Sequence, residues 1–219
     1  MSKETTIYGP HQGQKIYAAG KPLGEAKAAM ILIHGRGATA PSILDLAGVL
    51  SHPDIAYLAP QASGNTWYPY SFLSPMNQNE PGLSSALQVM ADVVAQVEAA
   101  GIPAEKIIIG GFSQGACLSS EFVARNARRY GGLIVFSGGV IGPPGTPRDY
   151  DGSLEGTPVF LGCSDTDFHI PAERVHETTA VFEGLGGNVT EKIYPGMGHT
   201  VIQDEIDHAQ KIVQGLFDN

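Results

Sequence analysis

One stretch of the chain decides its fold: Ile107-Ile108-Ile109-Gly110-Gly111-Phe112-Ser113-Gln114-Gly115-Ala116-Cys117-Leu118. The β-branched apolar run predicts a buried strand, and the residues after Ser113 suit a helix. Residues 111–115 fit G-x-S-x-G, in which a strand turns sharply into a helix and exposes a nucleophilic serine. Glycines are expected there because the turn is strained and neighbouring backbones approach closely. Since a Gly-rich chain also produces this pattern by chance, a purely structural turn is the alternative interpretation.

Length and composition favour one globular α/β domain over residues 1–219. Hydrophobic residues make up 42% of the chain and charged residues 16%, with a formal net charge of −9. The sequence contains no cluster of Lys and Arg. Binding to nucleic acid is therefore not expected, and binding to an anionic membrane surface is disfavoured. No apolar run approaches the length of a membrane-spanning helix.

The two cysteines and the N-terminal residues bear on the cellular compartment of the chain. Cys117 and Cys163 adjoin apolar runs and form no C-x-x-C pair, so buried free thiols are expected. Residues 1–6 are polar and lack an apolar core, so no signal peptide is expected. A cytoplasmic location follows as the expectation.

Strands and helices are expected to alternate almost to the end of the chain. Strands are expected at residues 15–19, 28–33, 55–58, 132–137, 158–161 and 189–194, besides the one that begins at Ile107. Helices are expected at 39–50, 83–100, 114–128, 172–185 and 202–216. This alternation predicts a mostly parallel central sheet with helices on both faces. Ligands gather at the carboxyl ends of such strands, where Gly35-Arg36, Ser113, the loop 165–167 and His199 all fall.

Three of these segments suit nucleophilic catalysis. A serine hydroxyl needs a base, and His199 lies in a Gly-flanked turn after the last strand. A carboxylate would orient that imidazole, and both Asp165 and Asp167 occupy the right loop, so the acid stays open. The chain order Ser, Asp, His is that of α/β-hydrolases. The alternative for His199 is a turn residue satisfied by backbone groups.

The glycine turn after the strand 28–33 predicts an oxyanion site. Backbone N–H groups of Arg36 and Gln114 are expected to hold the developing anion. The Arg36 side chain either is solvated or meets an anionic substrate group. His34 is expected to pack and hydrogen-bond locally.

Residues 61–82 form a long segment with no periodicity, and such loops tend to be functional. It carries Trp67, Tyr68, Tyr70 and Phe72, which would form a substrate wall or lid or, alternatively, anchor a surface loop. The expected substrate contacts are Gly35, Trp67, Tyr68, Phe72 and His169. A metal site built from Asp165, Asp167, His169 and His176 is disfavoured because their spacing matches no closed site, and no cofactor is expected.

With these residues placed, the chain resembles the carboxylesterase/acyl-protein thioesterase family of small α/β-hydrolases, also called phospholipase/carboxylesterase. The resemblance runs from Met30 to about Phe217. The family's H-G-x-G turn matches residues 34–37, its G-F-S-Q-G elbow is unchanged at 111–115, and its G-x-G-H turn matches 196–199. Its D-x-x-V-P acid loop matches residues 167–171, which favours Asp167 over Asp165.

The sequence also departs from the family pattern. Members with thioesterase activity usually have an aliphatic residue at the position of Arg36 and an Asp at the position of Ala38, and the loop 67–72 looks different. The resemblance therefore implies a serine carboxylesterase that acts on a small ester, with a homodimer as a candidate assembly. A thioesterase or lysophospholipase for longer acyl chains, and a non-catalytic binding protein on the same fold, are the alternatives.

Overall fold

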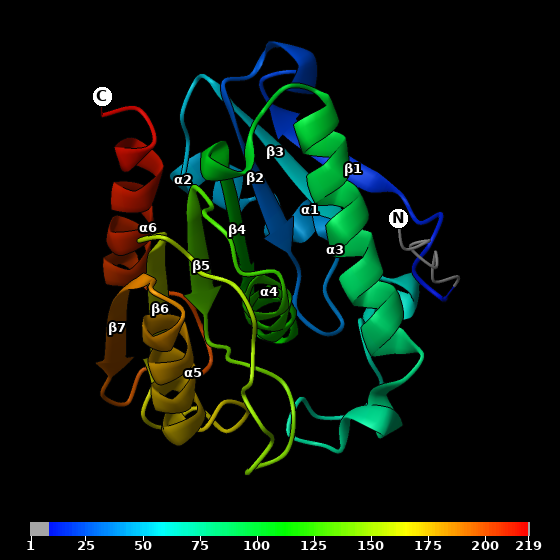
Figure 1. Ribbon diagram of the computed structural model, residues 1–219, viewed down its shortest axis with the longest axis vertical. Helices are drawn as coiled ribbons and strands as arrows, with labels where there is room; N and C mark the ends of the chain where they lie inside the picture. Colours follow the sequence, from blue (N-terminus) through cyan, green and yellow to red (C-terminus); the bar gives the residue numbers. More distant parts are fainter. Residues whose placement is uncertain (1–8, 219) are drawn as a thin grey trace.

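The computed structural model describes residues 9–218, so the N-terminal residues on which the signal-peptide expectation rests lie outside it. Seven strands form one sheet in the order β1-β3-β2-β4-β5-β6-β7, and every neighbouring pair is parallel except β1 with β3 (Figure 1). The strands are β1 Ile16–Gly20, β2 Ala28–Ile33, β3 Ile55–Pro60, β4 Ile107–Phe112, β5 Gly132–Phe136, β6 Pro158–Ser164 and β7 Asn188–Tyr194. The helices are α1 Ala40–Ile43, α2 Leu46–Val49, α3 Gly82–Ala99, α4 Gln114–Arg125, α5 Ala172–Gly184 and α6 Gln203–Gly215.

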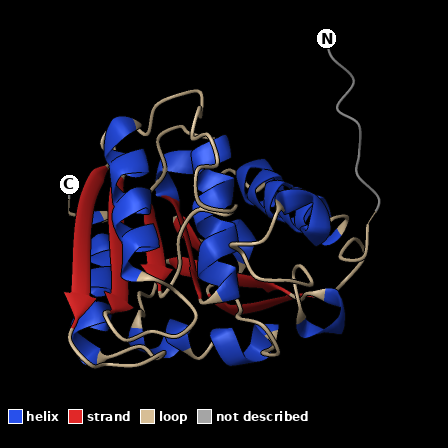
Figure 2. Cartoon of the chain, turned by 90° about the horizontal axis from the view of Figure 1, so that it is seen from below, coloured by secondary structure: helices blue, strands red, loops and turns tan. Residues whose placement is uncertain are grey.

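Helices cover both faces of the sheet, as predicted (Figures 1 and 2). Helices α3, α4 and α5 pack on one face, and α1, α2 and α6 pack on the other. Within β4, Ile107 and Ile109 belong to the first core and Ile108 to the second, because successive side chains of a strand point to opposite faces. The strand is apolar throughout because both of its faces are buried. Within residues 9–218, no helix combines the length and apolar composition needed to cross a bilayer.

Two expected helices differ from the structure, and the strand expected at 158–161 extends to Ser164 as β6. The helix expected at residues 39–50 is split into α1 and α2, joined by a tighter turn in which the Ala47 amide donates to the Leu44 carbonyl. Gly48, inside α2, is a poor helix former and weakens a long helix over this range, whereas Pro41 stands in the first turn of α1, where proline is tolerated. Helix α4 ends at Arg125 rather than near residue 128, because the Asn126 side chain donates to the Phe122 carbonyl and caps the helix end.

The turn between β4 and α4 has the sharp geometry that its sequence predicts. Ser113 adopts φ 57° and ψ −120°, a conformation rare for a residue with a Cβ. Its amide donates to the Phe136 carbonyl of β5, which holds the strained residue in place. A Cβ on Gly115 would lie 2.1 Å from the Ile33 carbonyl oxygen, and one on Gly111 would lie 2.7 Å from Gly115. Both glycines are therefore required by the close approach of α4 to β2.

A buried carboxyl group anchors the start of α6, just after the loop that carries His199. Glu205 is fully buried, and its Oε2 accepts a hydrogen bond from the Ile202 amide at 2.9 Å. Its Oε1 is buried without a hydrogen-bond partner and packs against Gly162, where a Cβ would lie 2.1 Å from it. Burial raises the pKa of Glu205 from its ordinary value of 4.5 to about 7.

Substituting Gly115 by Ala should destabilise the fold, because the new methyl group would collide with the Ile33 carbonyl. We expect a loss of roughly 1–3 kcal/mol or more in the free energy of unfolding, measured by chemical denaturation. Gly48→Ala is the matched control, because a Cβ at Gly48 meets nothing within 4 Å. It should leave stability unchanged or raise it by roughly 0.5–1 kcal/mol. Equal effects of the two variants would contradict the packing explanation.

Substituting Glu205 by Gln should flatten the pH dependence of stability. The folded chain holds the Glu205 proton up to about pH 7 and the unfolded chain only to about 4.5, so stability falls as the pH rises through that window. Relative to the variant, the parent chain should lose about 2 kcal/mol between pH 5 and pH 8, measured by denaturation at each pH. Glu183→Gln, at an exposed position of α5, is the control and should keep the parent slope.

Candidate active site

Ser113, His199 and Asp167 lie in one hydrogen-bonded row at the carboxyl edge of the sheet. His199 Nε2 lies 2.8 Å from Ser113 Oγ, and His199 Nδ1 lies 2.6 Å from Asp167 Oδ2. The serine follows β4, the aspartate follows β6 and the histidine follows β7. Because these strands run parallel in one sheet, with β5 between β4 and β6, their carboxyl ends bring together residues that are far apart in the sequence.

The Asp167 carboxylate is enclosed and heavily hydrogen-bonded. Its side chain has no exposed surface, and its Oδ1 accepts hydrogen bonds from the amides of His169 at 2.8 Å and Ile170 at 3.1 Å. Burial acts to raise the pKa of Asp167, but the hydrogen bonds from His199 and the two amides outweigh it and lower the pKa. The group is therefore ionised at neutral pH and can hold the Nδ1 proton of the imidazole.

Asp165 occupies the same loop but has a different partner. Its Oδ1 accepts a hydrogen bond from the Gly196 amide at 2.7 Å, and Ser164 Oγ accepts one from the Gly198 amide at 3.1 Å. Both contacts hold the turn that presents His199. Sequence reasoning missed Ser164, because a single serine at the end of a strand carries no distinguishing pattern.

Two backbone amides, those of Gln114 and Arg36, belong to the segments that flank Ser113. Gln114 is the first residue of α4, so no carbonyl of the helix can accept from its amide. Gly35 lies directly against the serine, since a Cβ on it would be 3.4 Å from Ser113 Cβ. In the same turn the Gly37 amide donates to Asn65 and the Ala38 amide donates to Gly35, which fixes the backbone around Arg36.

The side chains of Arg36 and Gln114 hold the segment 67–70 against the site. Arg36 donates to the carbonyls of Pro69 at 2.9 Å and Tyr70 at 2.6 Å. Gln114 accepts from the Trp67 amide and donates to the Tyr68 carbonyl, each at 2.9 Å. The Arg36 side chain is exposed to solvent, and the sequence did not predict its two hydrogen bonds to backbone carbonyls of this chain.

A cavity of about 560 Å³ opens above Ser113. Of the predicted substrate contacts, Gly35, Tyr68, Phe72 and His169 line it. Trp67 lies behind this wall, fully buried, with its indole N–H donating to the His34 carbonyl at 2.9 Å.

His34 and the two cysteines are buried side chains that pack within the protein. His34 is buried and bonds through its ring nitrogens to the Gly35 carbonyl and the Ala62 amide, which is the local packing predicted for it. Cys117 and Cys163 are free and buried, as predicted, and burial raises the pKa of each thiol to about 12. Thiols with such pKa values are chemically inert near neutral pH.

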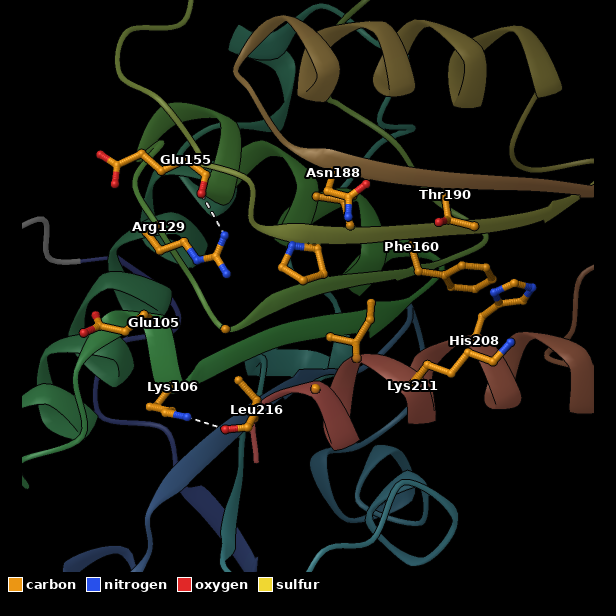
Figure 3. Close-up of a pocket in the computed structure, with 15 residues that line it drawn as sticks. Glu105, Lys106, Arg129, Glu155, Phe160, Asn188, Thr190, His208, Lys211 and Leu216 are labelled. Atoms are coloured by element: carbon orange, nitrogen blue, oxygen red, sulfur yellow. Dashed lines mark hydrogen bonds between the residues drawn. The ribbon is translucent and has the colours of Figure 1, made fainter. Parts of the chain in front are cut away.

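A larger cavity, of about 760 Å³, lies at the opposite edge of the sheet, where β4 to β7 begin (Figure 3). Figure 3 shows Lys106 pointing to the Leu216 carbonyl and Arg129 to the Glu155 carbonyl, so these cations have backbone partners. His208 stacks on Phe160 with ring centroids 5.1 Å apart. The residues that line this cavity include neither Ser113 nor His199.

The acid and histidine side chains of the loop do not gather around a metal position. Within residues 9–218 no group of three His, Cys, Asp or Glu side chains is arranged to hold a metal ion. His176 Nδ1 lies 2.8 Å from Glu191 Oε1 on β7, in a pair separate from Asp167.

Comparison with known proteins agrees with this architecture. The profile of the phospholipase/carboxylesterase family matches residues 15–216. The chain is similar to a crystal structure of a phospholipase/carboxylesterase from Dyadobacter fermentans, with 44% identity, a TM-score of 0.90, and coverage of 96% of this chain and 100% of that one. It is 28% identical to acyl-protein thioesterase 1 of Debaryomyces hansenii over 92% of this chain and 95% of that protein. It is 30% identical to acyl-protein thioesterase 1 of Eremothecium gossypii over 88% of this chain and 89% of that protein. The chain therefore belongs to the phospholipase/carboxylesterase family and has the α/β-hydrolase fold.

Proposed function

We propose that the chain is a serine esterase that hydrolyses small carboxylic esters through Ser113, His199 and Asp167. The observation that carries the proposal is the unbroken row of hydrogen bonds from Ser113 Oγ through the imidazole to the Asp167 carboxylate, at 2.8 Å and 2.6 Å. Each residue suits its role, because a serine needs a base and the base needs a carboxylate that fixes its tautomer.

In the proposed reaction, Ser113 Oγ attacks the acyl carbon while His199 Nε2 takes its proton. The tetrahedral intermediate collapses when the bond to the leaving oxygen breaks and His199 returns the proton to that oxygen. Water then attacks the acyl-enzyme by the same route and releases the acid. Asp167 stays ionised throughout and stabilises the imidazolium.

The amides of Arg36 and Gln114 would stabilise the anionic oxygen of the tetrahedral intermediate. Gln114 offers a helix N-terminal amide, which favours negative charge. Arg36 sits in the turn whose Gly35 touches Ser113. One such donor is worth about a hundred- to a thousandfold in rate.

The hydrogen-bonded wall of the cavity is the structural argument for a small acyl group. Arg36 and Gln114 hold residues 67–70 with four side-chain hydrogen bonds, so the wall that carries Tyr68 is fixed close to Ser113.

The second candidate is a thioesterase for longer acyl chains, favoured by the similarity to proteins named acyl-protein thioesterase 1. A non-catalytic binding protein has no use for the hydrogen-bonded row, which argues against that alternative. Rates against esters and thioesters of increasing acyl length distinguish the two enzymes, and a maximum at long chains would favour the thioesterase.

Ser113→Ala should abolish esterase activity while the fold persists, because the nucleophile is lost and the Cβ is retained. We expect kcat for p-nitrophenyl butyrate to fall at least about ten-thousandfold. A fluorophosphonate probe should label the parent chain and not the variant, and circular dichroism serves as the folding control. Full activity in the variant would reject the role of Ser113.

Asp167→Asn and Asp165→Asn form a matched pair. Asparagine at 167 would donate to the ring instead of accepting from it and would favour the wrong tautomer, so kcat should fall about ten-thousandfold. Asparagine at 165 keeps an oxygen that can accept from the Gly196 amide, so its loss should stay below about tenfold. Initial rates on p-nitrophenyl butyrate measure both. If Asp165→Asn is the more damaging change, the acid has been assigned to the wrong residue.

A further inference from the structure

The cavity above Ser113 has a positively charged lining in an acidic chain. The formal net charge of the chain is −9. Among the described residues that line this cavity there is no Asp or Glu, whereas Arg36 and His169 both form part of its wall. Asp167 lies behind His199 and has no exposed surface, so its carboxylate does not face the cavity. A permanent positive charge in such a lining attracts an anionic group.

Arg36 differs from most other arginines of the described chain in its partners. Ion pairs with glutamates hold the guanidinium groups of Arg125, Arg128, Arg148 and Arg174. The exposed Arg36 guanidinium instead donates to the carbonyls of Pro69 and Tyr70, which carry no charge. Because a guanidinium has five N–H groups, donors remain after these two bonds. The positive charge of Arg36 is therefore available to a ligand.

The guanidinium is already fixed at the cavity wall. Its Nη1 and Nη2 lie 2.9 Å and 2.6 Å from the two carbonyl oxygens, and its Cζ lies 5.8 Å from the ring centroid of Tyr68, which lines the cavity. An arginine that is held in place beforehand loses less side-chain entropy when it binds an anion. Arg36 and Ser113 line the same cavity, so one small molecule can contact both.

We propose that Arg36 determines substrate specificity by binding a carboxylate, so that the preferred substrates are small esters that carry a carboxylate besides the ester group. The inference rests on the proposed function. The planar fork of a guanidinium matches the geometry of a carboxylate. Arg36 is the one permanently charged side chain among the described residues of the lining, and it balances one negative charge. A phosphate monoester, with nearly two charges, would leave excess negative charge in the cavity.

Two matched pairs of esters test the proposal near neutral pH. Monoethyl glutarate carries its carboxylate in the acyl part, and ethyl glutaramate replaces that carboxylate by an amide of the same size. The ions of γ-acetoxybutyrate carry the carboxylate in the alcohol part, and γ-acetoxybutyramide is the neutral counterpart. In at least one pair, kcat/KM of the parent chain should be at least about tenfold higher for the anion than for the amide. The pair that shows this preference identifies the part that Arg36 binds.

The variants compare two exposed arginines that both donate to backbone carbonyls. Arg36→Gln should lower the anion-to-amide ratio of kcat/KM at least about fivefold. The ratio is the readout because a change in the wall or in the turn beside Ser113 affects both esters of a pair. Arg129→Gln removes the same charge from the cavity at the opposite edge of the sheet and should keep the parent ratio.

Other outcomes overturn the role of Arg36. A parent ratio near one in both pairs overturns it, as does a ratio that Arg36→Gln leaves unchanged. An equal fall in Arg129→Gln also overturns it, because net charge would then explain the preference. A parent chain that hydrolyses p-nitrophenyl butyrate and none of the four esters refutes the carboxylate preference and leaves the proposed function standing. Full activity of Ser113→Ala on p-nitrophenyl butyrate would overturn the proposed function instead.

Discussion

The contact between the first turn of α4 and the end of β2 determines where every other part of the site lies. Gly115 sits so close to the Ile33 carbonyl that no side chain fits between them. This approach forces Ser113 into its left-handed conformation and lifts its hydroxyl clear of the sheet. It also brings the Gly35 turn against the serine, so the nucleophile and the turn proposed to hold the oxyanion are positioned by one packing constraint.

The remaining groups are held by side chains that bind backbone. Ser164 and Asp165 fix the glycine turn that presents His199, while Arg36 and Gln114 fix the segment that carries Tyr68. Loops at the carboxyl edge of a parallel sheet lack the continuous ladder of backbone hydrogen bonds that strands form, so side-chain contacts of this kind help to define their shape. Rigid loops of this kind keep reacting groups within the small tolerance that catalysis demands.

The sequence was sufficient for features that depend on local pattern. The apolar run at 107–109 and the glycines around Ser113 predicted the strand, the turn and the helix, and the strand–helix alternation predicted the sheet. It could not separate Asp165 from Asp167 by pattern, because two residues of one loop differ only in where their side chains point. It also missed the partners of Arg36, since backbone carbonyls carry no residue signature. Trp67 was expected in the wall and lies behind it, because burial of an aromatic residue in an irregular segment depends on the whole packing.

The hydrogen bonds from Arg36 to the carbonyls of Pro69 and Tyr70 link the turn after β2 directly to the wall of the cavity above Ser113. An oversized acyl group that pushes these two residues outward pulls on the same arginine whose amide is proposed to face the tetrahedral intermediate. Such a molecule would still be captured, yet it would be turned over slowly. Selection against large acyl groups would then lower the rate of the chemical step rather than the binding affinity, because Arg36 links the cavity wall to the turn beside Ser113.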